Sequence, residues 1–253
     1  CRNCTVAPQY NSSQTMTLSL ETQFRLTDLG QARAFAEANE VTLRYVPELA
    51  SWVHWADGRW QVDCAMHAQQ RAKEQGAPLL EEAAAALKAG DNDLASGLLH
   101  TARRLATARG QRDLLELARS ERAVVTPLAA FDADPWALNT RQGVVALRQG
   151  TVRPHRAGDL MMLQAPVVFD PAATAPRWDA FLRRTFAGDA TMLAFVQRAA
   201  GCTLVGTATE QKFFFAHGSG ANGKSVFIRA LEEAFGNYAV ALNHATLASH
   251  RQE

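Results

Sequence analysis

Apolar and polar positions near the start of the chain follow the periods of one helix and a short hairpin. Thr27 is placed to cap a helix whose apolar stripe comprises Ala32, Phe35, Ala36 and Ala38. Alternation predicts strands over 43–46, 52–55 and 59–62, and Asp57-Gly58 is a hairpin turn signal before the last of them. Residues 20–62 therefore predict a small α+β unit with an aromatic hairpin. Its three tryptophans either form the core or stack on nucleic-acid bases.

The next segment is rich in alanine, leucine and charge, and its spacing predicts helices over 63–75, 78–89 and 92–122. We expect the last helix to break near Gly110, with Gly90 ending the second helix and Asp91 or Asn92 capping the third. Six arginines lie on this last stretch: Arg103, Arg104, Arg109, Arg112, Arg119 and Arg122. They favour a solvated helix face, with a phosphate-facing surface as the alternative.

Strand and turn patterns fill residues 131–176, and helical spacing returns over 177–200. At the other end of the chain, residues 1–19 predict a linker or the remnant of an upstream domain. Cys1-Arg2-Asn3-Cys4 is either half of a zinc site or a pair of free thiols. The chain begins at Cys1 rather than Met, and we expect it to be a piece of a longer protein.

Composition indicates a globular protein without a strong net charge. The 253 residues are 47% hydrophobic and 20% charged, which is typical of a globular chain. Lys and Arg number 26 against 25 Asp and Glu, so any nucleic-acid contact depends on local patches rather than on net charge. Four cysteines make no disulfide framework, and neither a membrane-length apolar run nor a secretory signal is present. We expect a cytoplasmic protein with no membrane partner.

One motif carries chemistry: Gly218-Ser219-Gly220-Ala221-Asn222-Gly223-Lys224-Ser225 fits the phosphate-binding loop pattern G-x-x-x-x-G-K-[ST]. Lys212 to Ala216 predicts a buried strand before the loop, and Val226 to Phe235 predicts a helix after it, ended by Gly236. Strand, glycine loop and helix form the context that the motif requires. We expect Phe213, Phe214 and Phe215 to lie in the middle of a parallel sheet.

The loop predicts an ATP site with Mg²⁺. Backbone N–H groups of the eight loop residues and the positive end of the following helix would surround the phosphates. Lys224 would reach the β- and γ-phosphates, and the Ser225 hydroxyl would bind Mg²⁺. Hydrolysis also needs an acidic motif at the end of a later strand. Only 28 residues follow Ser225, and none of them has that pattern.

The loop form G-S-G-A-N-G-K-S, with the residues before it, resembles the superfamily 3 helicases of phage and plasmid primase–helicase proteins. The likeness covers about residues 24–242 as a series of ordered short matches. They include Thr27-Asp28-Leu29-Gly30-Gln31-Ala32, Leu43-Arg44-Tyr45-Val46-Pro47-Glu48, Trp52-Val53-His54-Trp55, Arg59-Trp60, Asp134-Pro135-Trp136-Ala137-Leu138-Asn139, Gly143-Val144-Val145-Ala146-Leu147, Phe169-Asp170-Pro171-Ala172, Trp178-Asp179-Ala180-Phe181-Leu182 and Phe195-Val196-Gln197-Arg198. Cys202 and Met161-Met162 depart from the pattern.

The resemblance implies an α/β fold: an α+β N-terminal region, a helical middle and the start of an AAA+-like ATPase core. It places the N-terminal domain over 20–130, a connecting region over 131–200 and the ATPase domain from 201 onward. It implies an ATP-dependent helicase in phage or plasmid replication that acts on single-stranded or forked DNA as a ring, usually a hexamer. The family's second acidic motif, sensor, DNA-contacting hairpin and arginine finger would lie beyond Glu253.

Two alternatives stay open at this point. One is a P-loop NTPase of another type, such as a packaging motor or a nucleotide kinase. The other is a DNA-binding or ring-scaffolding module without turnover. DNA binding without ATP hydrolysis would favour this second alternative.

Overall fold

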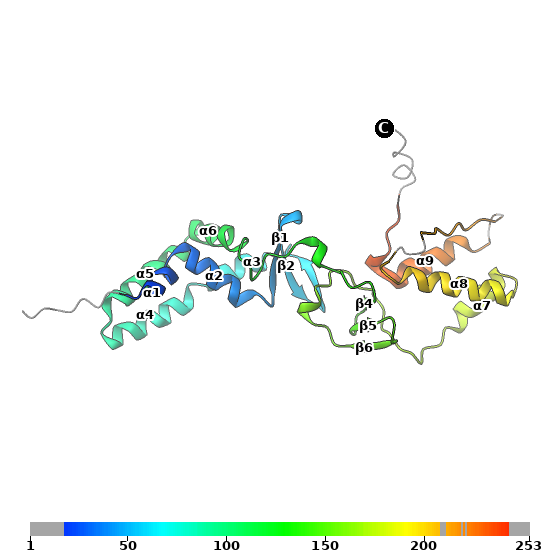
Figure 1. Cartoon of the computed structure of the whole chain (residues 1–253), viewed down its shortest axis with the longest axis horizontal. Helices are drawn as coiled ribbons and strands as arrows, with labels where there is room; N and C mark the ends of the chain where they lie inside the picture. Colours follow the sequence, from blue (N-terminus) through cyan, green and yellow to red (C-terminus); the bar gives the residue numbers. More distant parts are fainter. Residues whose placement is uncertain (1–17, 208–210, 219, 221, 243–253) are drawn as a thin grey trace, which may run out of the picture. The chain divides into compact units, whose positions relative to one another are not determined.

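The computed structural model describes residues 18–207, 211–218, 220 and 222–242, which fall into two units (Figure 1). One unit comprises the described residues up to Glu40 together with Ala65–Val124. The other comprises Val41–Cys64 and the described residues from Val125 onward. The Cys1–Cys4 pair and residues 5–17 of the predicted linker lie outside the described residues.

The first unit is helical. Its helices are α1 (Leu20–Arg25), α2 (Asp28–Asn39), α3 (His67–Glu74), α4 (Ala77–Ala89), α5 (Asn92–Leu105) and α6 (Ala108–Ala118). Helix α4 packs on α5, and α6 packs on α2, α3 and α5. Alanines dominate the buried positions, with larger side chains at Phe35, Leu98, Leu105 and Leu114. Small side chains let these helix axes approach closely while still excluding water.

Several predicted helix ends are confirmed. Thr27 caps α2, and its side chain accepts the Gly30 N–H at 3.1 Å. Asp91 caps α5 by accepting the Leu94 N–H at 3.0 Å, and Gly90 ends α4. These helix ends depend on local interactions, because each cap residue forms a hydrogen bond with a backbone group about three residues away.

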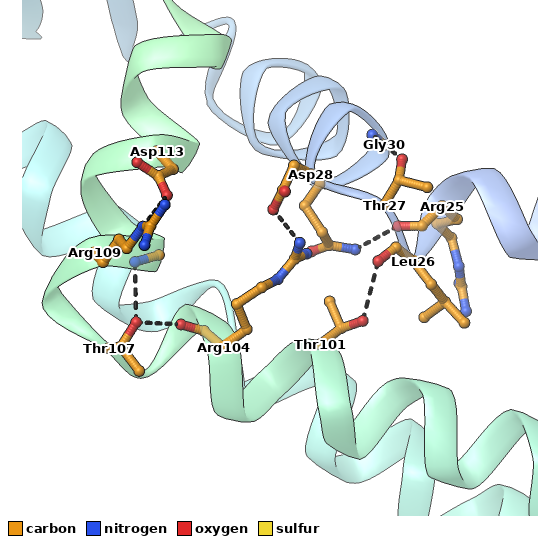
Figure 2. Close-up of polar contacts among 12 residues, drawn as sticks. Arg25, Leu26, Thr27, Asp28, Gly30, Thr101, Arg104, Thr107, Arg109 and Asp113 are labelled. Carbon is orange, nitrogen blue, oxygen red and sulfur yellow. Dashed lines mark hydrogen bonds and ion pairs between the residues drawn. The ribbon is translucent and has the colours of Figure 1, made fainter.

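The corner between α1 and α2 is closed by a threonine and a glycine (Figure 2). Thr27 Oγ1 donates to the Phe24 carbonyl at 2.6 Å while it accepts from Gly30. A methyl group at Gly30 would overlap that same carbonyl oxygen. Glycine at this position therefore lets the chain turn from one helix into the next without a steric clash.

The corner between α5 and α6 repeats this arrangement and gives the exact position of the predicted break (Figure 2). Thr107 Oγ1 donates to the Arg104 carbonyl at 2.8 Å and accepts the Gly110 N–H at 3.0 Å, and a methyl group at Gly110 would overlap the Arg104 carbonyl. The predicted break near Gly110 is confirmed, whereas the predicted end at residue 122 lies beyond the end of α6 at Ala118. Helix α5 ends at Leu105, and Gly110 lies inside the first turn of α6. Thr107 sets the break, because its side chain supplies the cap.

The second unit begins with a three-stranded antiparallel sheet of β1 (Leu43–Val46), β2 (Ser51–Ala56) and β3 (Arg59–Val62), as predicted. A second antiparallel sheet comprises β4 (Ala137–Asn139), β5 (Val144–Ala146) and β6 (Thr151–Arg153). Short 3₁₀ turns cover Pro47–Leu49, Leu128–Ala130, Ala157–Asp159 and Gly236–Tyr238. The coarse prediction of mixed helices and small sheets is confirmed, whereas the AAA+-like core stays a prediction.

Trp60 is the centre of the second unit's core. It is 1% exposed and packs with Val46, Val53 and Phe131, and its indole N–H donates to the Ala157 carbonyl at 2.8 Å. A ring enclosed in this way cannot stack on a base, so for Trp60 the core interpretation is confirmed.

Three helices complete the second unit: α7 (Pro176–Thr185), α8 (Ala190–Thr203) and α9 (Lys224–Phe235). Helices α7 and α8 cover the helical stretch predicted over 177–200 apart from a break at 186–189, and Gly236 ends α9 as predicted. None of the described helices is long and apolar enough to cross a membrane.

Candidate nucleotide-binding site

The glycine loop leads directly into helix α9. Gly223 occupies the cap position before Lys224 with φ of 85°, a left-handed conformation that side chains disfavour. Ser219 and Ala221 lie outside the described residues, whereas the other six loop residues are described. The first turn of α9 has backbone N–H groups with no acceptor within the helix, so this end favours an anion.

The Lys224 side chain folds back over the loop. Its ammonium donates to the Gly218 carbonyl at 3.0 Å and to the Asn222 side-chain oxygen at 2.7 Å. Both of these acceptors are neutral groups. A phosphate oxygen would be a stronger, charge-assisted acceptor at the same position.

A cavity of about 850 Å³ opens beside the loop. The described residues that line it are Phe181, Arg184, Thr185, Gly220, Asn222, Gly223, Lys224, Ser225 and Val226. Two of them are cations and none is acidic. The predicted Gly218 lies at the Lys224 contact rather than in this lining. The Ser225 hydroxyl is the lining group that the loop motif assigns to Mg²⁺, and a carboxylate to share the metal does not come from the described lining residues.

Helix α7 is held against the loop and against α9. The Trp178 ring stacks on Phe181, with ring centroids 5.4 Å apart, and on Phe227 of α9, with centroids 5.7 Å apart. A methyl group placed on Gly223 would lie 3.1 Å from both Phe181 and the Thr185 hydroxyl oxygen. The last turn of α7 is therefore a wall of the candidate site.

The predicted strand before the loop is wrong. Residues 211–218 pair with no strand among the described residues. Phe213 is 87%, Phe214 53% and Phe215 78% exposed, although Phe214 makes an edge contact with Phe195. A strand is fixed by hydrogen bonds to neighbouring strands, so apolar sequence alone does not create one.

Arg184 and Thr185 are lining residues that the sequence prediction missed. They lie 34 and 33 residues before Gly218, the first residue of the loop, and nothing in their spacing relates them to it. The available sequence feature was an Arg-Arg-Thr run inside the helical stretch predicted over 177–200, which by itself indicates a solvated helix face. Only the packing of α7 against Gly223 brings them to the cavity.

Three of the six arginines in the stretch from α5 to just after α6 pair with acids of the same unit. Arg104 pairs with Asp28, Arg109 pairs with Asp113 at 3.5 Å and Arg119 pairs with Glu116. Figure 2 shows the first two pairs. Such pairs favour the solvated-face interpretation over a phosphate-facing surface.

A comparison with protein families found one model that matches more than half of the chain. It is described as D5 N terminal like and matches residues 32–187. The matched range begins inside α2, crosses both units and ends just after α7, before the glycine loop. Among curated proteins, none matches the chain.

Proposed function

The chain belongs to the D5 N-terminal-like family, the N-terminal domain of phage and plasmid primase–helicases. From this premise we propose that the chain is part of an ATP-dependent DNA helicase. The family supports a role in DNA replication. The loop at residues 218–225 supports the ATP site, although it lies outside the matched range. The family match and the loop each support one part of this activity, and the proposal combines them.

One observation carries the ATP site: the Lys224 ammonium lies over the loop, bonded to Gly218 and Asn222, at the first turn of α9. On binding, the β- and γ-phosphates would replace these two neutral acceptors. The backbone N–H groups at the start of α9 would bind the same phosphates. Bound Mg²⁺ would neutralise phosphate charge, with Ser225 as its protein ligand.

We further propose that the protein acts on single-stranded or forked DNA as a ring, usually a hexamer. In such a ring ATP lies between subunits, so the acidic group and the arginine that hydrolysis needs need not come from the cavity lining described here. The positive lining beside the loop is compatible with that arrangement, because it supplies cations and leaves the acid to another segment.

Substitution of Lys224 tests the proposal. In the 253-residue chain, Lys224→Ala should weaken MgATP binding by about 100-fold, because it removes the charged donor that the phosphates would contact. Isothermal titration calorimetry measures this loss. Lys212→Ala, an exposed lysine six residues before Gly218, is the matched control and should bind MgATP as the unaltered chain does.

DNA binding by the same variants separates the candidate functions. Fluorescence anisotropy with single-stranded DNA should give the same affinity for Lys224→Ala as for the unaltered chain. Unchanged MgATP binding by Lys224→Ala would show that the loop is not the site. Tight DNA and MgATP binding without turnover would support the module without turnover, and phosphoryl transfer to a nucleotide without DNA would support a kinase.

A further inference from the structure

Neighbouring arginines at the end of α7 reach different cavities. Arg183 lines a cavity of about 580 Å³ with the acidic Asp179 and mostly apolar neighbours. Arg184 lines the loop cavity together with Lys224. Both side chains are exposed, and both lie in the last turn of one helix. The pair therefore offers an internal comparison between two similar cations in different surroundings.

Arg184 is a cation of the loop cavity whose own side chain has no acidic neighbour in the described lining. Among the described residues its guanidinium forms no hydrogen bond or ion pair, and the described lining of its cavity holds no acid. Lys224 and the N-terminal end of α9 add positive charge to the same cavity. Two positive charges that line one cavity repel each other, and an anion bound between them offsets this repulsion.

The packing of α7 holds Arg184 at this position. Phe181 and Thr185 lie against Gly223, so the helix turn that carries Arg184 is in contact with the loop itself. Trp178 joins the same helix to α9 by stacking on Phe227. A guanidinium on an anchored helix loses less conformational entropy on binding than one on a free loop.

We propose that Arg184 is a phosphate-binding residue of the loop cavity and contacts the polyphosphate of the nucleotide together with Lys224. The planar guanidinium presents two parallel N–H donors, which match the oxygens of a phosphate group. Thr185 supplies a hydroxyl donor at the same wall of the cavity. This inference rests on the proposed nucleotide site and adds a residue from outside the loop motif.

The test compares Arg184→Gln with Arg183→Gln in the 253-residue chain. The probes are MgATP and inorganic tripolyphosphate, each titrated by calorimetry. Arg184→Gln should weaken the binding of both probes about tenfold, since one exposed charge-assisted contact is lost. Arg183→Gln should leave both within about twofold of the unaltered chain. Arg184→Lys should give an intermediate affinity, because it keeps the charge and loses the paired donors.

Several outcomes would overturn the inference. Equal affinities for Arg184→Gln and Arg183→Gln would remove Arg184 from the site. A loss for MgATP without a loss for tripolyphosphate would mean contact with the nucleoside rather than with the phosphates. A lower melting temperature for Arg184→Gln with affinity restored on cooling would mean a structural role.

The inference and the ATP site fail in distinguishable ways. If Lys224→Ala abolishes binding while Arg184→Gln has no effect, the loop site stands and only the role of Arg184 is rejected. If the unaltered chain binds neither probe, both proposals are rejected together.

Discussion

At the scale of single residues, a tyrosine joins segments of the second unit that are far apart in the sequence. The Tyr238 hydroxyl accepts the Asn139 backbone N–H at 3.1 Å and contacts the Leu163 carbonyl at 3.4 Å. Asn139 is fully buried, and its side-chain amide donates to the carbonyls of Gly58 and Leu163, each at 3.0 Å. Burial, with a smaller contribution from the negative charge of Asp132, raises the pKa of Tyr238 to about 12.

Tyr238→Phe should destabilise the second unit by about 1–2 kcal/mol at neutral pH, because the buried Asn139 N–H loses its acceptor. The gap should narrow as the pH rises. The folded state keeps its phenol proton up to about pH 12, while the unfolded state releases it near pH 10, so the unaltered chain loses stability over that interval. The Phe variant has no such proton to release.

Urea unfolding of both chains at several pH values measures this gap. Tyrosinate absorbance gives an independent reading, since the component missing from Tyr238→Phe should titrate near 12. A gap that stays constant or widens above pH 10 would contradict the assigned environment of Tyr238.

The residues that the sequence predicted well are those whose partners lie within a few positions. Thr27 and Asp91 cap their helices through the N–H groups of Gly30 and Leu94, which the spacing alone indicates. Arg184 could not be predicted in this way, because its place in the cavity depends on how α7 packs against Gly223. Local hydrogen bonds leave a pattern in sequence, and packing between distant segments leaves none.

At the scale of elements, the two helix corners of the first unit require the same short sequence pattern. Each uses Thr-x-x-Gly, at 27–30 and at 107–110, with the threonine bonded to a carbonyl of the preceding helix. Gly110→Ala should destabilise the unit by about 2–3 kcal/mol, because the added methyl group would overlap a backbone carbonyl that cannot rotate away. Gly30→Ala should cost a similar amount for the same reason.

Gly76→Ala is the control for both variants. A methyl group there would lie 3.6 Å from the Ala102 carbonyl oxygen, which is ordinary contact, and the change should be within about 0.5 kcal/mol of neutral. Thermal denaturation followed by circular dichroism of the helices compares the three. Equal melting temperatures for Gly110→Ala and Gly76→Ala would mean that the corner is looser than described.

The two predicted strand regions show when sequence periodicity is sufficient to predict a strand. The hairpin of β2 and β3 was predicted because alternation and the Asp57-Gly58 turn both lie within its own residues. The strand predicted over 212–216 was wrong, since its apolar run has no neighbouring strand to pair with among the described residues. An apolar segment specifies burial, but a partner is what makes it a strand.

At the scale of the whole molecule, the buried core and the family match occupy nearly the same stretch of chain. Every buried residue of the described chain lies between Gly30 and Ala165, and the match spans 32–187. Helices α8 and α9, by contrast, contain no buried residue, and their contacts involve half-exposed rings such as Trp178 and Phe227. Stability should therefore differ along the chain, because burial of apolar surface is the main favourable term in folding.

Hydrogen–deuterium exchange measures this difference directly. Backbone amides of α2, α5 and α6 should exchange at least about 100-fold more slowly than those of α8 and α9, because opening the buried helices exposes far more apolar surface. Addition of MgATP should slow exchange in the first turn of α9 while leaving α5 unchanged, since the phosphates would bind those N–H groups. Equal protection of α5 and α9 in the free chain would mean that contacts outside those described stabilise α9 as strongly as a buried core does.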